Sequence, residues 1–383
     1  MRFEAGHLFA ATELQPHHIP DLRALRCAAA DGIYQIGPAP DSRTLSLEAC
    51  GEAAPSASAL YMEGWRDRET KPIPTRMVSL KDALHLGQDC LANAAGRTFA
   101  QSTVHGGKPV RGDVIVREGR RFVARAEVRI GREFTRPVLY LGTIPKQFGH
   151  FLLDLLPRLW PVQWAKEYGY EIVAHADYDL SRATYQSPFF EAVGLSRGDV
   201  TILNEPARFS RLFKPLALYD LHRGANPAFF ETCMQVTEIL SARLATYRQP
   251  ERVYLSRRCW GKRRILQNEE AVEALFQERG YEIVFPEQLS VLEQMAAVAS
   301  AKHLAGAIGS QTYLALFQRR PETAIILAPM TFTFADDAII AAYRQARCGF
   351  VLGTPSDMTQ SPRNQDYSVD MDEVARALDT MVG

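Results

Sequence analysis

The alternation of hydrophobic and polar residues predicts strands in the first third of the chain. Apolar and polar positions follow each other with a period of two over 113–117 and 122–130, with turn residues at 118–120 between them. This period predicts a hairpin or meander, because successive side chains of a strand face opposite sides of the sheet. The apolar run at 137–142 predicts another strand, followed by a helix. Residues 1–75, rich in Ala, Pro and short polar clusters, predict an N-terminal extension of short strands and loops.

From about residue 147 onward, short apolar runs alternate with helix-length amphipathic stretches. The apolar runs predict strands at 171–175, 200–204, 215–219, 252–256, 281–285, 303–306 and 324–328. The amphipathic stretches predict helices at 187–193, 227–247, 268–279, 291–301 and 311–317. Such alternation is typical of βαβ units, so we expect parallel sheets covered by helices.

The main break in this pattern lies near Pro250, where a long predicted helix ends and a new strand begins. We therefore expect an N-terminal extension with an α/β domain at 1–248 and a second α/β domain at 249–355. A linker and a short amphipathic helix (371–381) follow at 356–383. The expected fold class is α/β, with two Rossmann-like domains that face a cleft.

Composition excludes several classes of protein. Hydrophobic residues make up 46% of the 383 residues and charged residues 23%, which excludes a disordered or fibrous chain. Lys+Arg and Asp+Glu are both 44, so we expect neither a nucleic-acid partner nor a polybasic membrane anchor. The basic residues are 36 Arg and 8 Lys. Because Arg binds phosphate and carboxylate groups with paired hydrogen bonds, the places where it clusters are informative.

The cysteines and the N-terminus favour a reducing compartment. The six cysteines are scattered, with no CxxC pair and no Cys/His spacing of a zinc site, so neither a disulfide framework nor a metal site is expected. The N-terminal stretch contains acidic residues and lacks the apolar segment of a secretory signal, and no apolar run is long enough to cross a membrane. We expect a cytoplasmic protein.

A histidine, a carboxylate and an arginine recur at helical spacing near the middle of the chain. His150, Asp154 and Arg158 are four residues apart, so one continuous helix would place them on one face. Pro157 has no N–H for the carbonyl of Leu153, so we expect the helix to kink or restart there. A kink at this point can direct the three side chains into a cleft. The alternative is an ordinary surface His–Asp pair, worth about 0.3 kcal/mol.

A cluster of positive charge directly follows the strand predicted at 252–256. Its side chains are those of Arg257, Arg258, Lys262, Arg263 and Arg264. Ligands of open α/β sheets bind at the carboxyl ends of strands, and several guanidinium groups there suit a phosphate or diphosphate. Asn268, which precedes two glutamates, is expected to cap the next helix, and we also keep it as a candidate substrate contact. A solvated basic loop is the alternative.

A third stretch combines small residues with a predicted helix start. Gly309, Ser310 and Gln311 follow the strand at 303–306, where backbone N–H groups can approach an anion. The spacing is not that of GxGxxG, a P-loop or a nucleophile elbow, so a plain tight turn is the alternative.

Three further polar residues lie at a neighbouring strand end and helix start. They are Glu287, Glu293 and Gln294. Carboxylates at strand ends often accept ribose hydroxyls, whereas helix capping is their commoner role. We keep all three as candidate substrate contacts.

Taken together, these stretches resemble the family 61 glycosyltransferases, which have a GT-B fold and include bacterial capsular-polysaccharide enzymes. The resemblance runs from about Tyr140 to Ala328, and it depends on the order and spacing of its parts rather than on any single one. These parts lie at 149–159, 254–257, 263–269, 280–287, 289–290, 293–294 and 306–317.

The resemblance implies an inverting transfer of a sugar from a nucleotide-sugar donor to a hydroxyl of a capsular or other cell-surface polysaccharide. The domain at 249–355 would hold the nucleotide, and the N-terminal domain would hold the acceptor, a saccharide or glycolipid. Arg257, Arg263 and Arg264 would face the diphosphate, helped by the backbone of the Gly309 loop. Peripheral association with membrane-bound polysaccharide machinery, at the inner face of the membrane, is an open alternative to a purely cytoplasmic location.

Inversion requires one base that takes the proton of the acceptor hydroxyl, together with stabilisation of the departing phosphate. We assign His150 or Asp154 as this base, with the other residue orienting it. No DxD-type metal motif lies in a suitable loop, so cationic side chains would replace a divalent ion. No cofactor is expected beyond the nucleotide-sugar, which is a co-substrate.

Two positions depart from the family pattern. Ile308 and Leu314 stand where the family usually has a His before the glycine loop and an Asn in the following helix. If those residues contact the donor, this protein uses another donor, binds it weakly, or has lost activity. A non-catalytic partner or scaffold of a polysaccharide assembly system is therefore the alternative to an enzyme. A phosphotransferase is a weaker one, because a P-loop and a carboxylate pair for Mg²⁺ are missing.

Overall fold

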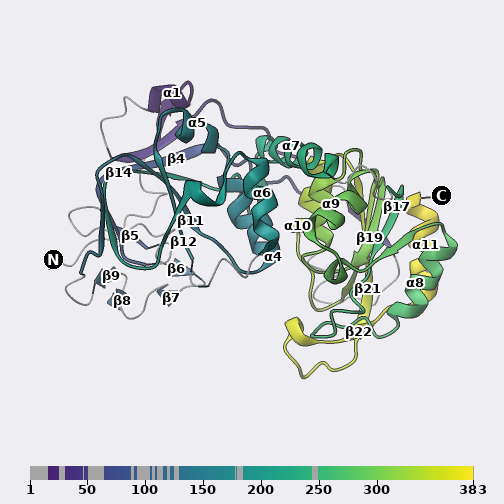
Figure 1. The fold of residues 1–383 in the computed structure, drawn as a ribbon. Helices are drawn as coiled ribbons and strands as arrows, with labels where there is room; N and C mark the ends of the chain where they lie inside the picture. The colour runs from purple at the N-terminus through teal and green to yellow at the C-terminus, as the bar shows by residue number, and fades with distance from the viewer. Residues whose placement is uncertain are drawn as a thin grey trace. The chain divides into compact units, whose positions relative to one another are not determined.

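The chain forms two compact units, each built from two separate segments. Unit 1 comprises Met1–Ala39 and Pro74–Leu218, and unit 2 comprises Pro40–Ile73 and Tyr219–Gly383 (Figure 1). The computed structural model describes residues 16–25, 31–45, 47–50, 64–87, 90–92, 104–105, 108–109, 115–118, 121–124, 129–176, 178, 184–243 and 249–382.

Unit 1 is built on a mixed nine-stranded sheet. Its strand order is β1-β2-β4-β14-β11-β12-β13, with β5 on β4 and β10 on β14. The strands are β1 (His17–Ile19), β2 (Gly32–Ile36), β4 (Arg76–His85), β5 (Leu91–Ala92), β10 (Arg132–Phe134), β11 (Val138–Thr143), β12 (Glu171–His175), β13 (Val200–Leu203) and β14 (Ala207–Pro215). β14, β11, β12 and β13 run parallel, whereas β4 is antiparallel to both β2 and β14.

Short helices and two small hairpins complete the described part of unit 1. The helices are α1 (Leu22–Leu25), α4 (Phe148–His150), α5 (Val162–Glu167) and α6 (Ser187–Ala192). The hairpins are β6 (Val104–His105) with β7 (Lys108–Pro109), and β8 (Ile115–Glu118) with β9 (Arg121–Ala124). The hairpin predicted from the period-two pattern is therefore confirmed, although residues 113–114 and 125–128 of the predicted strands lie outside the described residues.

Unit 2 is built on a seven-stranded, mainly parallel sheet. Its order is β18-β17-β19-β20-β21-β22, with β3 added on β21. The strands are β3 (Leu47–Cys50), β17 (Arg252–Leu255), β18 (Glu282–Val284), β19 (His303–Ala307), β20 (Thr323–Pro329), β21 (Arg347–Pro355) and β22 (Tyr367–Ser368). The helices are α7 (Pro227–Ala242), α8 (Glu269–Glu278), α9 (Val291–Ala299), α10 (Asp336–Tyr343) and α11 (Met371–Val382).

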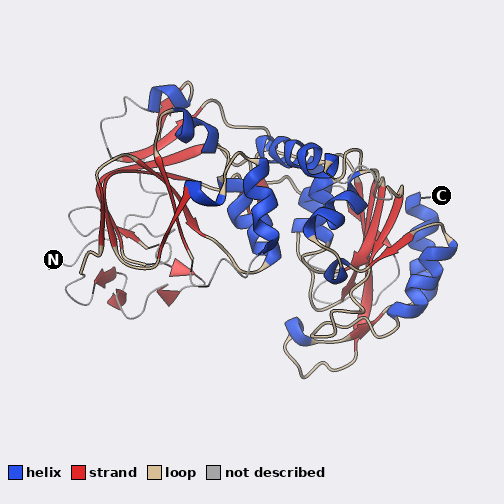
Figure 2. Cartoon of the chain, in the orientation of Figure 1, coloured by secondary structure: helices blue, strands red, loops and turns tan. Residues whose placement is uncertain are grey.

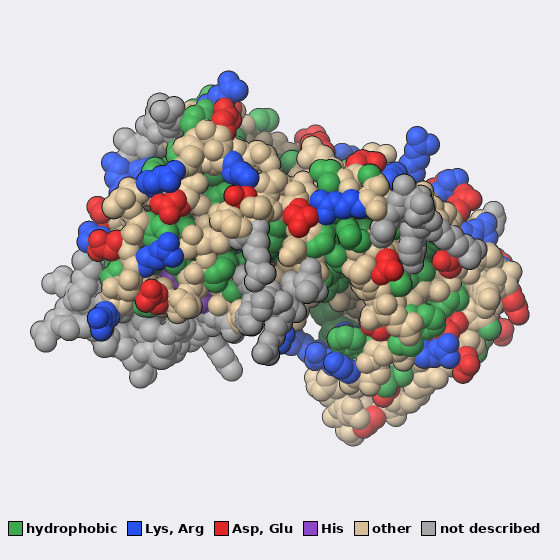
Figure 3. All heavy atoms as spheres, in the orientation of Figure 1, with side chains coloured by type: hydrophobic (Ala, Val, Ile, Leu, Met, Phe, Trp, Pro, Cys, Tyr) green, Lys and Arg blue, Asp and Glu red, His purple; other side chains and the backbone are tan. Residues whose placement is uncertain are grey.

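Helices cover both faces of the unit 2 sheet (Figure 2). On one face, Phe276 of α8 and Leu378 of α11 belong to a buried cluster with Tyr254 and Ile325 of the sheet. Strands that are buried on both faces are apolar throughout, which is why β19 and β20 are continuous apolar runs in the sequence. The visible surface carries basic and acidic side chains interspersed with apolar ones (Figure 3). The predicted α/β class with parallel sheets is thus confirmed.

The C-terminal segment belongs to the body of unit 2. Residues 356–367, predicted as a linker, end in β22, which pairs with β21, and Tyr367 is fully buried with its hydroxyl donating to Leu327. The predicted helix 371–381 corresponds to α11, whose apolar stripe is in the core. The prediction of a linker was wrong because this mostly polar stretch contains one aromatic residue, Tyr367, that is buried in the core of unit 2.

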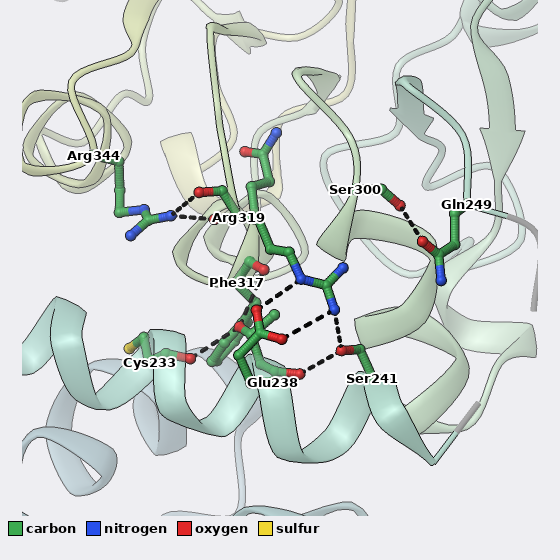
Figure 4. Close-up of polar contacts among 10 residues, drawn as sticks. Cys233, Glu238, Ser241, Gln249, Ser300, Phe317, Arg319 and Arg344 are labelled. Atoms are coloured by element: carbon green, nitrogen blue, oxygen red, sulfur yellow. Dashed lines mark hydrogen bonds and ion pairs between the residues drawn. The ribbon is translucent and has the colours of Figure 1, made fainter. Parts of the chain in front are cut away.

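Helix α7 also belongs to unit 2, which moves the division of the chain upstream of Pro250. The hydroxyl of Thr237 lies 3.1 Å from the carbonyl oxygen of Phe317 and 2.9 Å from that of Cys233 (Figure 4). Arg319 pairs with Glu238 at 2.7 Å and donates to Ser241 at 2.7 Å. The contacts with Phe317 and Arg319, more than 70 residues apart in sequence, fix α7 on the segment before β20.

One strand was predicted in the wrong place. The apolar run 215–219 is mostly loop, and β14 covers Ala207–Pro215 instead. Phe209 and Leu212 of this strand are buried while Ser210 is exposed, so the strand has one solvated face. The arginines at 208 and 211 interrupt its apolar positions, which is why the sequence pattern did not predict it. Other elements were missed as well, among them β4, α5, α10 and β21. The predicted helix 311–317 is the 3-10 segment η7 (Thr312–Phe317).

In the described part of the chain, no helix is long and apolar enough to cross a membrane. Cys90, Cys233, Cys259 and Cys348 carry free thiols there, and Cys27 lies outside it.

Truncating Phe276 tests the core of unit 2. Its ring lies 4.7 Å from Tyr254 and 4.9 Å from Tyr281 and is fully buried, so Phe276→Ala should lower the free energy of unfolding by about 3–5 kcal/mol. Urea unfolding measures this change. Ile265→Ala is the control: this side chain is 39% exposed, so its loss should cost less than about 0.5 kcal/mol. Equal losses would contradict the described packing.

Candidate functional site

The strand order of unit 2 creates a switch point between β17 and β19. From β17 the chain adds β18 on one side, and then returns to add β19, β20 and β21 on the other. Neighbouring parallel strands whose connections leave in opposite directions open a crevice at their carboxyl ends, where ligands of such sheets bind. The loops at this point are residues 256–268, after β17, and residues 308–311, after β19.

Arg257 joins these two loops. Its Nη1 donates to the carbonyl oxygen of Ile308 at 2.6 Å, and its Nη2 donates to the carbonyl oxygen of Arg263 at 3.3 Å. Burial lowers the pKa of its guanidinium. The side chain therefore links the two loops and carries a desolvated positive charge between them.

A buried carboxylate binds the backbone of Arg257. Glu269, at the start of α8, accepts the backbone N–H of Arg257 at 2.8 Å and the hydroxyl of Tyr254 at 3.2 Å. Burial raises the pKa of the Glu269 carboxyl. Its second oxygen, Oε2, is buried without a hydrogen-bond partner.

The remaining cations of the loop have different partners. Arg258 forms ion pairs with two glutamates of α8, Glu273 at 2.9 Å and Glu270 at 3.4 Å. Its charge is therefore paired with that of the helix. Lys262 and Arg263 are exposed, and the ammonium of Lys262 lies 4.8 Å above the ring of Trp260.

Arg264 adopts a backbone conformation that side chains rarely take. Its φ is 52°, in the left-handed region, which costs about 1 kcal/mol outside glycine. Its guanidinium lies 4.4 Å above the ring of Phe332, and its Nε is buried without a hydrogen-bond partner. Burial, together with repulsion from Arg257 and Arg263, lowers the pKa of Arg264 to about 10. Three guanidinium groups that repel one another would be stabilised by an anion.

The loop after β19 is shaped around Arg257. A side chain at Gly309 would place its Cβ 3.1 Å from Nη1 of Arg257 and 2.5 Å from Oε1 of Gln311, so a larger residue would displace the Gln311 amide. The amide of Gln311 donates back to the carbonyl of Ala307, and Ser310 is half-buried beside it. The structure thus brings Arg257, Arg263, Arg264 and the Gly309 loop together.

A buried carboxyl supports this loop from the other side. The Thr312 hydroxyl lies 2.8 Å from the carbonyl oxygen of Gly309 and 2.6 Å from Oδ1 of Asp337. A hydroxyl has one hydrogen, so donation to Gly309 requires Asp337 to donate in turn, which a protonated carboxyl can do. Burial raises the pKa of Asp337 to about 7, which favours this arrangement.

Three of the four remaining predicted residues of unit 2 have local structural partners. Glu293 accepts the N–H of Ser290 at 2.7 Å in a capping box, which lowers its pKa, and Gln294 donates to the carbonyls of Pro286 and Leu289. Asn268 is the N-cap residue of α8 but makes no side-chain cap; its amide bonds instead to the backbone of Val369. Glu287 is exposed, and its charge interacts with that of Arg257.

The predicted His–Asp pair lies in unit 1. Nδ1 of His150 is 2.7 Å from Oδ2 of Asp154, and the two side chains are 52% and 31% exposed. The helix changes here from α4 to the π-helical η1 (Phe151–Leu155) and then to the 3-10 segment η2 (Leu156–Arg158). The break expected at Pro157 is therefore present as a change of helix type, a feature often found at functional sites.

One family model matches part of the chain. Residues 148–326 match the family model described as Glycosyltransferase 61. These residues form a glycosyltransferase family 61 domain. The chain matches no curated protein significantly. The family 61 domain contains the arginine loop, the Gly309 loop and the His150–Asp154 pair, and it includes parts of both units.

The two departures from the family pattern lie in the interior of the family 61 domain. Ile308 and Leu314 are 2% and 0% exposed, so neither side chain faces the crevice. Ile308 contributes through its backbone, whose carbonyl accepts from Arg257.

Sequence reasoning missed a second His–Asp pair in unit 2. Nδ1 of His222 lies 2.6 Å from Oδ2 of Asp336, which is fully buried at the start of α10. The available signal was the pair Asp336 and Asp337 in an apolar stretch, which resembles the acidic first turn of an ordinary helix.

The pKa of Asp337 predicts a pH dependence of stability. Folding raises this pKa from its ordinary 3.8 to about 7, so between these values the folded protein holds a proton that the unfolded chain releases. Stability should therefore fall as the pH rises through this window, and Asp337→Asn should reduce the slope. Urea unfolding at several pH values measures it. Asp372→Asn, at an exposed carboxyl of α11, is the control. An unchanged slope in Asp337→Asn would contradict the assignment.

Proposed function

We propose that this protein is an inverting glycosyltransferase that moves a sugar from a nucleotide-sugar donor to a hydroxyl of a capsular or other cell-surface polysaccharide. The family 61 domain implies sugar transfer, with a sugar donor and an acceptor. The observation that supports the donor side is the position of Arg257, which bridges the loops after β17 and β19 at the switch point of the unit 2 sheet.

The donor diphosphate would bind to the arginine loop. Charge-assisted hydrogen bonds from guanidinium groups to phosphate oxygens are stronger than neutral ones and are often paired. Arg263 is exposed, and Arg257 and Arg264 add positive charge behind it. Backbone N–H groups near Gly309 and Ser310 would contribute further donors. The positive charge of these groups would take the place of a divalent ion at the leaving group.

The acceptor would bind to unit 1. We propose His150 as the base that removes the proton from the acceptor hydroxyl, with Asp154 holding Nδ1 so that Nε2 accepts the proton. Arg158, at the end of η2, would contact the substrate. The two units would form a GT-B arrangement in a cytoplasmic protein.

Arg263→Ala tests the donor site. A nucleoside diphosphate should raise the melting temperature of the wild type, and the variant should bind it roughly tenfold to hundredfold more weakly, because a charge-assisted hydrogen bond is lost. Thermal shift and calorimetry with UDP, GDP and their sugars measure the change. Arg320→Ala is the control, because this exposed arginine precedes β20 and so lies at the amino end of the strand.

No binding of any of these nucleotides by the folded wild type would refute the proposed donor class. Equal binding by Arg263→Ala would refute the assignment of the arginine loop.

His150→Ala and Asp154→Ala test the base. Both variants should keep nucleotide binding, since the arginine loop is in unit 2, but transfer should fall by about 10²–10⁴-fold. Radiolabelled sugar transfer to a polysaccharide acceptor measures the rate. Wild-type rates in both variants would show that the base is another group. Wild-type function of the double variant in cells would favour a non-catalytic scaffold.

A further inference from the structure

The second half of the arginine loop (residues 256–268) pairs with the C-terminal segment of unit 2. Leu266 and Tyr367 form a parallel β-bridge. The N–H of Tyr367 donates to the carbonyl oxygen of Ile265 at 2.9 Å, and the N–H of Gln267 donates to that of Tyr367 at 2.8 Å. The loop is therefore held by a short ladder, and not only by the strand that precedes it.

Side chains extend this ladder at both ends. The amide of Asn268 donates to the carbonyl oxygen of Val369 at 2.8 Å, and its oxygen accepts the N–H of Val369 at 3.2 Å. At the other end, the N–H of Ile265 donates to Oδ1 of Asp366 at 2.8 Å. Each side chain supplies a partner that a backbone group would supply in a regular strand, so the pairing covers residues 265–268.

The body of unit 2 holds the backbone of Asp366 in place. Its carbonyl oxygen accepts the N–H of Ser356 at 2.8 Å and the hydroxyl of the same residue at 3.0 Å. The residue after it, Tyr367, is fully buried. The residue before it, Gln365, is 2% exposed and accepts the hydroxyl of Thr331. The Asp366 carboxylate is therefore attached to a fixed part of the chain.

Arg264 is the residue that these contacts constrain. Its φ of 52° is in the left-handed region, which a residue other than glycine keeps only where its surroundings hold it. The bond to Asp366 fixes the peptide group that follows Arg264, and the carbonyl oxygen of Arg363 accepts Nη1 of the same arginine at 3.4 Å. Two residues of the C-terminal segment thus hold both the backbone and the guanidinium of Arg264.

The residues that hold Arg264 lie outside the family 61 domain. The family model matches residues 148–326, whereas Arg363 and Asp366 come after it. The matched part therefore includes the cations of the arginine loop, but not the segment that fixes the last of them.

We propose that Asp366 is a positioning residue of the donor site, which holds Arg264 in the conformation that binds the diphosphate. This inference rests on the proposed function, because it takes the arginine loop as the diphosphate site. Arg264 lies close enough to Arg257 and Arg263 for their charges to repel one another. A bond that fixes the peptide group after Arg264 keeps its guanidinium in this cluster before the ligand binds, so less conformational freedom is lost on binding.

The charge of Asp366 and its hydrogen bond have opposite effects on an anion. A carboxylate near a diphosphate repels it, so removal of an Asp366 that only lay nearby would strengthen the binding of the diphosphate. Removal of a positioning Asp366 would weaken it, because the peptide group after Arg264 would lose its partner. The direction of the change therefore distinguishes the two roles.

Asp366→Ala tests the proposal. This change removes the acceptor of the Ile265 N–H, so the affinity for UDP or GDP should fall about tenfold, as expected for the loss of one hydrogen bond to a charged group. Calorimetry with the nucleotide that the wild type binds measures the change. In the transfer reaction, the KM for the donor should rise while the KM for the acceptor stays unchanged, because only the donor site is altered.

Asp366→Asn separates the hydrogen bond from the charge. Its side-chain oxygen can accept the same N–H without a negative charge. This variant should bind the diphosphate as tightly as the wild type, or more tightly. Rescue by asparagine would therefore assign the effect of the alanine variant to the hydrogen bond with Ile265.

Asp357 supplies a matched control from the same segment. Its carboxylate accepts the N–H of Thr359 at 2.8 Å and the amide of Gln360 at 3.1 Å, so its partners lie in its own turn. Asp357→Ala removes a negative charge of the C-terminal segment but no contact with the arginine loop, and it should bind the diphosphates as the wild type does. Melting temperatures establish that each variant is folded before its affinity is compared.

The possible results separate this inference from the proposed function. Equal or tighter diphosphate binding by Asp366→Ala, together with a loss in Arg263→Ala, would overturn the inference and leave the donor site standing, whether or not the melting temperature falls. Equal losses in Asp366→Ala and Asp366→Asn would also overturn it, because the hydrogen bond would then not be the cause. A wild type that binds neither UDP nor GDP would overturn both proposals.

Discussion

The hydrogen bond from Arg257 to the carbonyl oxygen of Ile308, 2.6 Å long, is the contact on which the candidate site depends. It connects the ends of two neighbouring strands that the chain leaves in opposite directions. The arginine is fixed by its backbone as well, through the buried carboxylate of Glu269. Two carbonyl oxygens hold the guanidinium and a carboxylate holds the backbone N–H, so the side chain keeps little freedom and its positive charge is fixed before a ligand binds.

This rigid centre contrasts with the side chains around it. Lys262 and Arg263 are exposed, whereas Arg264 combines a left-handed backbone with a ring contact to Phe332. A strained arginine that also repels its neighbours is costly in the empty protein. The cost is consistent with a site organised for a ligand rather than for stability.

The sequence predicted those elements whose signal is local. β12, β17 and α9 appear close to their predicted bounds because each is a short apolar run or a regular amphipathic stretch. β14 was misplaced because arginines interrupt its apolar positions, and β22 was hidden because a two-residue strand depends on its partner β21. Pairing between distant segments leaves no periodic signal in either of them.

The same distinction holds for the site. The arginine and glycine loops could be recognised because each is contiguous and follows an apolar strand. Asn268 and Glu293 were counted with them as substrate contacts, but in the folded protein their polar atoms bind Val369 and Ser290. His222 and Asp336 are 114 residues apart, so neither has a neighbour in sequence that suggests a pair.

Strand β3 has a consequence for the synthesis of the protein. It pairs with β21, with Leu47 opposite Cys348. During synthesis, β3 therefore cannot pair until the ribosome has made β21, about 300 residues later in the sequence. The ribosome releases all of unit 1 before it completes unit 2, and the ends of such a long loop meet slowly because closure costs chain entropy. The arginine loop therefore emerges, with its charges, before the sheet that organises it is complete. The pairing of β3 with β21 in unit 2 therefore forms only after both distant segments have been made.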